Sequence, residues 1–199
     1  MTKNKNLSNL SQGAKNNSPG PVGITPRTGQ IICGDIDMCI DRHGLWHYMG
    51  SPIGRLELVK LFSTVMRRDN IGDHWLITPS EMCRIQVDDA AFMAVELTQE
   101  GSEKDQTLTF RTNIDKKYVL SASHPLRIEI NPETGEPAPY IGLDYGLEAK
   151  LSRAVFYQLV NLGTAETVQK DNIYGIWSAG HFFPIGSTED IEATDRNGS

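Results

Sequence analysis

The chain has 199 residues, a formal charge of −6 at pH 7 and a sequence pI near 5.4. This length suits one large domain or two small ones, and it allows a real core without disulfides or structural metals. The net negative charge repels phosphate backbones, so we expect no nucleic-acid partner.

The cysteines and the hydropathy pattern predict a reducing, cytoplasmic setting. Cys33, Cys39 and Cys83 are odd in number and lack the C-x-x-C spacing of zinc sites and redox dithiols. We therefore expect no disulfide. The five histidines are dispersed as well, so we expect no metal site. No apolar run approaches the ~20 residues of a membrane span, and the N-terminus lacks the apolar core of a signal peptide.

Composition divides the chain into four parts. Residues 1–28 are rich in Asn, Ser, Gly, Lys and Pro, which predicts a flexible leader. The polar residues 189–199 predict a flexible tail. Between them we expect an N-terminal half at 29–97 and a C-terminal half at 98–188.

The N-terminal half is predicted to open with a strand. Ile36, Met38 and Ile40 alternate with Asp35 and Asp37, which is the period-two pattern of a half-buried strand. A return strand is expected over 45–49. Apolar residues at helical spacing then predict a first helix over 55–68. Further strands follow, most simply wired as a meander, at 75–78, 84–87, 92–97, 107–111, 118–120 and 126–130.

A second helix is predicted over 147–162, followed by a closing hairpin at 173–178 and 181–183. Each predicted helix follows a similar motif, Tyr48-Met49-Gly50 with Gly54, and Tyr140-Ile141-Gly142 with Gly146. This repeat suggests structural duplication, although strand-turn-helix units are common and the helical faces align better one residue later. The expected fold class is α+β, with two similar halves that each pack one helix on a small, mostly antiparallel sheet.

Two polar groups are candidates for ligand binding. The turn that holds Ser51, followed by Arg55 at the predicted helix start, could bind an anion, although an ordinary glycine-containing turn explains it as well. Arg111, Thr112 and Asn113 combine a guanidinium, a hydroxyl and a carboxamide at a strand end, which suits a phosphate, a ribose or a base edge. Such strand ends are also ordinary turns.

Near the C-terminus, Trp177 offers an aromatic plane for stacking and Ser178 offers a hydroxyl, although a Trp beside small residues is often a core residue. Ser178 is out of register with the G-x-S-x-G nucleophile motif. Asp35 and Asp37 could form a paired-carboxylate site, but a solvated strand face is the simpler explanation. We identify no catalytic motif, so the chain is more simply explained as a binding protein than as an enzyme.

Ten blocks in a fixed order resemble a bacterial family called domain of unknown function 1285, over about residues 33–186. The blocks are Cys33-Gly34-Asp35-Ile36-Asp37-Met38, Gly44-Leu45-Trp46-His47-Tyr48-Met49-Gly50-Ser51-Pro52-Ile53, Leu61-Phe62 with Arg67-Arg68, Leu76-Ile77-Thr78-Pro79, Val87-Asp88-Asp89, Phe110-Arg111-Thr112-Asn113, His124-Pro125-Leu126-Arg127, Gly146-Leu147-Glu148-Ala149, Phe156-Tyr157-Gln158-Leu159 and Gly175-Ile176-Trp177-Ser178.

The resemblance implies a duplicated α+β protein whose C-terminal half is loosely pleckstrin-homology-like, with no established activity. It also implies a nucleotide-type ligand between the two halves and a role in signalling. The leading hypothesis is therefore a protein that binds or senses a small anionic or nucleotide-like ligand at the interface of its halves. Arg55 and Arg111 would take the charge, and Ser51, Thr112 and Asn113 would hydrogen-bond to the ligand. Trp177 or Trp46 would stack on it, and Ser178 would also belong to the site.

Two alternatives stay open. The chain could be a protein–protein interaction module without a small ligand, whose partner is unidentified. It could also be a hydrolase that acts on a phosphorylated metabolite through Asp35 and Asp37. The ligand and any cofactor are not predicted by the sequence.

Overall fold

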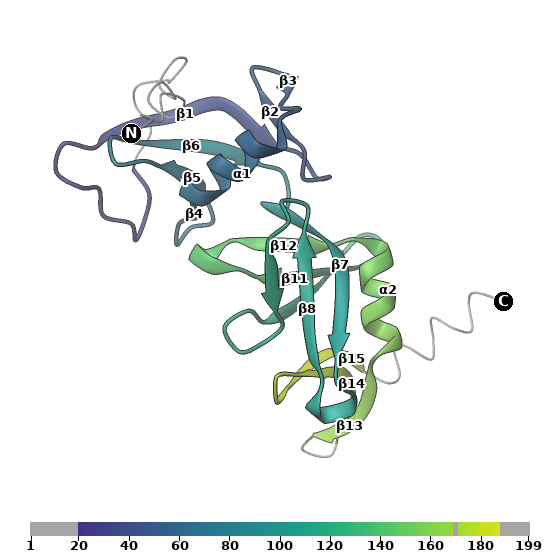
Figure 1. The fold of residues 1–199 in the computed structure, drawn as a ribbon. Helices are drawn as coiled ribbons and strands as arrows, with labels where there is room; N and C mark the ends of the chain where they lie inside the picture. Colours follow the sequence, from purple (N-terminus) through teal and green to yellow (C-terminus); the bar gives the residue numbers. More distant parts are fainter. Residues whose placement is uncertain (1–19, 169–170, 188–199) are drawn as a thin grey trace. The chain divides into compact units, whose positions relative to one another are not determined.

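The structure, a computed structural model, describes residues 20–168 and 171–187. The predicted tail and most of the predicted leader lie outside these residues. The chain forms two compact units (Figure 1). Unit 1 comprises the described residues up to Ala91 together with Asp144–Leu147, and unit 2 comprises Phe92–Leu143 and the residues from Glu148 onward. The boundary lies at the start of a strand, six residues before the position expected from the sequence.

Unit 1 is a six-stranded sheet with one helix, α1 (Leu56–Val65). The strands lie in the order β3-β2-β1-β6-β5-β4. Their bounds are β1 Ile31–Ile40, β2 Trp46–Tyr48, β3 Ser51–Pro52, β4 Met66–Arg68, β5 His74–Ile77 and β6 Glu81–Val87.

The core of unit 1 lies between the sheet and α1. Ile36, Met38 and Ile40 are buried on one face of β1, which confirms the predicted alternation. Trp46 of β2 stacks on Phe62 of α1, with ring centroids 6.2 Å apart. This aromatic contact fixes the helix on the sheet, because both rings bury a large apolar area.

Unit 2 has a six-stranded sheet in the order β10-β11-β12-β7-β8-β9, a helix and a small three-stranded sheet. Helix α2 (Arg153–Asn161) packs along β7 (Figure 1). The strands are β7 Phe92–Glu100, β8 Thr107–Thr112, β9 Lys117–Val119, β10 Leu126–Ile130, β11 Pro137–Gly142, β12 Glu148–Leu151, β13 Thr164–Val168, β14 Asp171–Ser178 and β15 His181–Ser187. Two short 3₁₀ helices cover Glu103–Asp105 and Asp144–Gly146.

The fold is α+β, and the two six-stranded sheets have the same connectivity. Each consists of two antiparallel three-stranded meanders. In both sheets the first strand of the first meander pairs in parallel with the last strand of the second, as β1 with β6 and β7 with β12. The expected duplication is therefore present, and each sheet is mostly antiparallel.

The Tyr-x-Gly repeat does not mark this duplication. Tyr48 lies at the end of β2, in the first meander of its sheet, whereas Tyr140 lies on β11, in the second meander of its own. The helices also differ in position, because α1 connects β3 to β4 whereas α2 follows β12. The sheet topology is duplicated, but the strand-turn-helix unit is not.

The predicted start of the second helix at residue 147 is wrong. Residues Glu148–Leu151 form β12, with Ala149 and Leu151 buried in alternation. The helix begins after Ser152, whose side chain caps it by accepting a hydrogen bond from the Val155 N–H at 3.4 Å. The short period-two pattern before the cap was masked by the longer helical pattern that follows it.

Candidate functional site

Unit 1 contains a cavity beside strands β1, β5 and β6, which we call the Arg84 cavity. Its volume is about 330 Å³. The residues around it belong to three neighbouring strands and to the turn before β5. They are Asp35, Ile36, Gly72, Asp73, His74, Arg84, Ile85, Gln86 and Val87.

Arg84 is held between two carboxylates at this cavity. Its Nε donates to Asp35 Oδ1 at 2.5 Å and its Nη2 donates to Asp35 Oδ2 at 3.0 Å, so this pair is bidentate. Its Nη1 donates to Asp73 Oδ2 at 2.7 Å. The hydrogen bonds to Asp35 and then to Asp73 raise the pKa of Arg84, which keeps the guanidinium charged.

Strand pairing places these groups together. Asp35 of β1 lies opposite Arg84 of β6, which in turn lies opposite Trp75 of β5. The Arg84 guanidinium lies 5.9 Å from the centroid of the Trp75 ring. Residues paired across neighbouring strands share a face of the sheet, so the three side chains meet although up to 49 residues separate them in the sequence.

Ser51 and Arg55 belong to unit 1 but lie elsewhere in it. Ser51 is exposed on the two-residue strand β3, whose backbone pairs with β2. Arg55 is exposed and extended before α1, and its side chain forms no cap hydrogen bond. These observations do not test the anion-binding role predicted for this turn, so that role stays a prediction.

Arg111, Thr112 and Asn113 are held by hydrogen bonds within unit 2. Arg111 donates to Glu96 at 2.6 Å and to Asp115 at 3.1 Å, and the bond to Glu96 is the main cause that raises the pKa of Arg111. The fully buried Thr112 donates its hydroxyl hydrogen to a main-chain carbonyl at 3.2 Å. Asn113 Oδ1 accepts from a β7 backbone N–H at 3.1 Å. All three side chains support the local structure of this sheet.

Trp177 and Ser178 lie on β14, and both are engaged. The Trp177 indole donates to Glu166 at 3.0 Å, and Lys104 Nζ lies 5.0 Å from the Trp177 ring centroid. Ser178 is fully buried, accepts a hydrogen bond from the Leu108 N–H at 3.0 Å and donates one to the Leu120 carbonyl at 2.7 Å. Ser178 lies near the start of β8, because it binds Leu108 there, whereas Arg111–Asn113 lie at the end of β8. The predicted site residues of β14 and those of β8 therefore do not meet at one end of this strand.

The sequence did not indicate the Arg84 cavity. The sequence pattern pairs Asp35 with Asp37 on one face of a strand, whereas in the structure the Asp35 carboxylate binds Arg84. Asp73 and Arg84 belong to no binding or catalytic motif in the sequence. The parallel pairing of β1 with β6 brings these residues together, and it requires a crossover that local patterns do not reveal.

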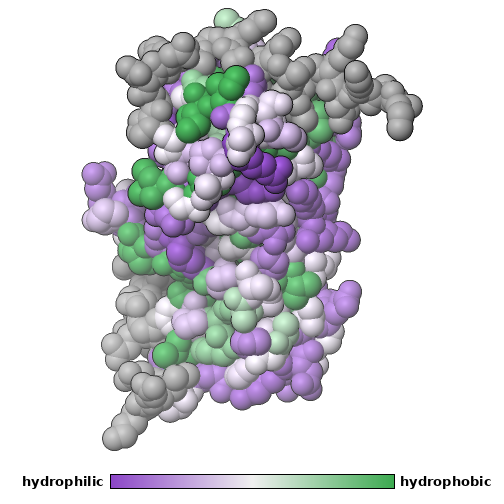
Figure 2. Space-filling view, turned by 90° about the vertical axis from the view of Figure 1, so that its left-hand side faces the viewer, coloured by the Kyte–Doolittle hydropathy of each residue, from purple (hydrophilic) through white to green (hydrophobic). Residues whose placement is uncertain are grey.

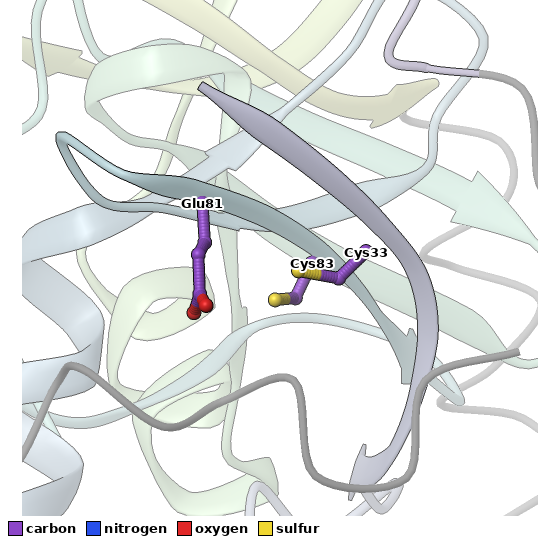
Figure 3. Close-up of side chains that lie close together, drawn as sticks. All are labelled: Cys33, Glu81 and Cys83. Carbon is purple, nitrogen blue, oxygen red and sulfur yellow. The ribbon is translucent and has the colours of Figure 1, made fainter. Parts of the chain in front are cut away.

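A second group that the sequence did not indicate consists of Cys33, Glu81 and Cys83. Figure 3 shows their side chains projecting from β1 and β6 into the same space. One ligand atom from each, two sulfurs and one carboxylate oxygen, all lie within 4.8 Å of one another, and all three residues are buried. Burial is the main cause that raises the pKa of the Cys33 and Cys83 thiols.

Family models cover most of the described chain. The model described as the N-terminal domain of DUF1285, a domain of unknown function, matches residues 30–90, and the one described as the C-terminal domain matches residues 91–185. The chain belongs to the DUF1285 family. The resemblance found in the sequence is thereby confirmed, and the family boundary at 90/91 lies one residue from the boundary between the two units at 91/92.

Two solved DUF1285 structures are similar to this DUF1285 protein. One is a family protein from Silicibacter pomeroyi DSS-3, with 40% identity, a TM-score of 0.76, and coverage of 88% of this chain and 93% of the other. The other, from Shewanella baltica OS155, has 26% identity, a TM-score of 0.52, and coverage of 63% and 91%. A search of curated proteins found no match. In the part of this DUF1285 chain that the structure describes, no helix is long and apolar enough to cross a membrane.

Proposed function

We propose that this DUF1285 protein binds a small polar molecule, without changing it chemically, in the Arg84 cavity of unit 1. The observation that carries the proposal is a guanidinium fixed between two carboxylates beside a cavity of about 330 Å³. Cavities of about 300 to 1,000 Å³ are typical of small-molecule sites. The volume therefore suits a ligand of metabolite size.

The charges around the cavity define the ligand class. Asp35 and Asp73 offer two negative groups against the single guanidinium of Arg84. An ammonium group can approach both carboxylates without breaking the ion pairs, whereas an anion must displace a carboxylate from Arg84. We infer a ligand that carries an ammonium group, with or without a carboxylate that shares Arg84, as in an amino acid or a small polyamine.

Binding without catalysis is supported by the state of the acidic groups. Asp35 accepts two hydrogen bonds from Arg84, and Asp73 accepts one. A carboxylate used in this way holds a cation in place and is poorly placed to take a proton from a substrate. The hypothesis of an anionic or nucleotide-like ligand between the halves, with a signalling role, stays a prediction.

The test is a thermal-shift screen of the full chain against amino acids, polyamines and nucleotides, followed by calorimetry. A ligand at 100 times its Kd stabilises the folded state by about 2.7 kcal/mol, which is a readily measured shift. Asp73→Asn and Arg84→Met should remove the shift. Arg127→Met is the matched control, because Arg127 also forms a bidentate pair, with Glu148, but lies in unit 2.

The screen also defines what would contradict the proposal. A nucleotide that stabilises the chain equally in Arg84→Met would move the ligand site away from this cavity. Absence of any thermal shift with amino acids and polyamines would contradict the proposed ligand class. A shift that Arg127→Met abolishes and Arg84→Met preserves would place the site in unit 2.

Protein–protein interaction is the second candidate. Leu45 and Met49, on either side of β2, are 57% and 66% exposed, which is high for apolar side chains. On the face that Figure 2 shows, however, hydrophobic residues form small separate groups among hydrophilic ones. Loss of partner capture in Leu45→Lys/Met49→Lys, with small-ligand binding unchanged, would favour this candidate.

A further inference from the structure

The three buried residues Cys33, Glu81 and Cys83 form a cluster that the proposed function does not use, which we call the thiol cluster. Cys33 is 3% exposed, Glu81 is 8% exposed and Cys83 is fully buried. Buried charged groups are normally paired, since an unpaired carboxylate loses its hydration. Glu81 Oε2 has no hydrogen-bond partner among the described residues, which distinguishes it from an ordinary buried carboxylate.

The backbone explains why these side chains meet. Glu81 and Cys83 are two residues apart on β6, so they project to the same face of the sheet. On β1 the register shifts between Ile32 and Gly34, so Cys33 is the extra residue of a bulge. Gly34, with a φ of 70°, adopts the left-handed conformation found at such bulges. The bulge directs Cys33 toward β6, as Figure 3 shows.

The positions of the ligands are fixed by backbone hydrogen bonds. The Glu81 N–H donates to the Thr78 hydroxyl at 3.0 Å, and the Thr78 N–H donates to the Glu81 carbonyl at 2.8 Å. The Cys33 thiol donates to the Ile31 carbonyl at 3.9 Å, a weak contact that a metal can replace. Ligands on paired strands are better preorganised than ligands on loops.

We propose that Cys33, Glu81 and Cys83 bind one Zn²⁺ ion, which links β1 to β6, with water completing the coordination. Two sulfurs and one carboxylate oxygen are a ligand set that suits Zn²⁺, whereas Ca²⁺ and Mg²⁺ prefer oxygen alone. Tetrahedral Zn–S bonds of about 2.3 Å place two sulfurs about 3.8 Å apart. The atoms lie within 4.8 Å of one another, so side-chain rotations that move them by at most about 1 Å close the site.

The ion also explains the Glu81 carboxylate oxygen that has no hydrogen-bond partner among the described residues. Glu81 contributes a negative oxygen to a buried space that otherwise holds two thiols. Zn²⁺ binds the two cysteines as thiolates, and their two protons pass to solvent as the ion enters. The cation offsets the charge of the three anionic ligands and replaces the missing hydrogen bond to Glu81 Oε2 with a metal–oxygen bond. The site is distinct from the Arg84 cavity, because none of the three ligands is among the residues around that cavity.

The test uses the full chain, reduced and freed of metal with a chelator, and titrated with Co²⁺ as a spectroscopic substitute for Zn²⁺. The expected result is one Co²⁺ per chain, with thiolate-to-cobalt charge-transfer absorption that Zn²⁺ abolishes. Cys33→Ser should weaken binding by more than about 100-fold, because even the loss of a second-shell partner costs about 10- to 100-fold. Glu81→Gln, which keeps the side-chain shape, should weaken binding while retaining some thiolate absorption.

Cys39→Ser is the matched control, since Cys39 lies on β1 but outside the thiol cluster, and it should bind Co²⁺ like the parent chain. Near-UV circular dichroism identifies any variant that fails to fold, in which case Glu81→Gln decides. Failure of the fully reduced chain to bind Co²⁺ or Zn²⁺ overturns the proposal. Binding that is unchanged in both Cys33→Ser and Glu81→Gln also overturns it.

Discussion

The Asp69 carboxylate accepts a hydrogen bond from the Trp75 indole Nε1 at 3.1 Å, and both side chains are buried in unit 1. The same carboxylate accepts backbone N–H groups from Val22 at 3.1 Å, Ile71 at 3.1 Å and Asp73 at 2.9 Å. One side chain therefore fixes the turn before β5, which contributes to the Arg84 cavity, and part of the segment before β1.

Asp69→Asn should destabilise unit 1 by about 2 to 4 kcal/mol. Hydrogen bonds to a charged group are worth about 1.5 to 3 kcal/mol, and asparagine has only one accepting oxygen and no charge. Urea unfolding followed by tryptophan fluorescence measures the change, since Trp46 and Trp75 are both in unit 1. Asp37→Asn, at an exposed position on β1, is the control and should change stability little.

The contribution of Asp69 should depend on pH. Burial raises the pKa of this carboxyl, but its four hydrogen bonds outweigh burial and the net pKa is lowered. A group whose pKa is lower in the folded state than its unfolded value of about 3.9 stabilises the protein above that value. The stabilisation is lost as the pH falls through the folded pKa.

The measurement is the difference in unfolding free energy between the parent chain and Asp69→Asn as a function of pH. It should be constant above about pH 5 and should shrink as the pH is lowered toward 3. Taking the difference removes the contributions of other carboxylates, such as Asp41, whose pKa is also lowered. A difference that grows on acidification would contradict the assignment.

Local patterns predicted the strands better than they predicted the sites. In β1 and β10, apolar residues alternate with polar ones over several positions, and this period-two pattern is visible in the sequence. The family resemblance also predicted the correct fold class, whereas the Tyr-x-Gly repeat did not mark the true duplication. The Arg84 cavity and the thiol cluster depend on the parallel pairing of β1 with β6, and the thiol cluster also depends on a bulge at Cys33. Neither feature has a local signature.

The predicted ligand-binding residues have polar and aromatic side chains whose chemistry also suits structural roles. Arg111 could bind a phosphate, but in the structure it pairs with Glu96 and Asp115 on its own sheet. A hydroxyl such as that of Ser178 can form hydrogen bonds with buried backbone groups as readily as with a ligand. Only tertiary contacts distinguish the two uses.

Ser178→Ala should therefore destabilise unit 2 by about 1 to 3 kcal/mol even without a ligand. The substitution leaves the buried N–H of Leu108 and the carbonyl of Leu120 without their hydroxyl partner. Chemical unfolding of the free chain measures the effect. Ser123→Ala is the control, because Ser123 is exposed and its hydroxyl forms a hydrogen bond with the Ser121 hydroxyl at 3.1 Å. Unchanged stability in Ser178→Ala would return this residue to the list of candidates for a purely ligand-binding role.

Gly175→Ala should disrupt the pairing of β14 with β15. A Cβ at Gly175 would lie 2.5 Å from the Phe183 carbonyl oxygen and 2.5 Å from the Phe182 ring. Because a backbone oxygen cannot rotate away, the strands must separate, and overpacking of this kind costs about 1 to 3 kcal/mol. Gly186→Ala in the same hairpin is the matched control, since a Cβ there meets nothing within 4 Å. Thermal unfolding should show a lower Tm for Gly175→Ala alone, and equal Tm values for the two variants would show that the hairpin can relax around the added methyl group.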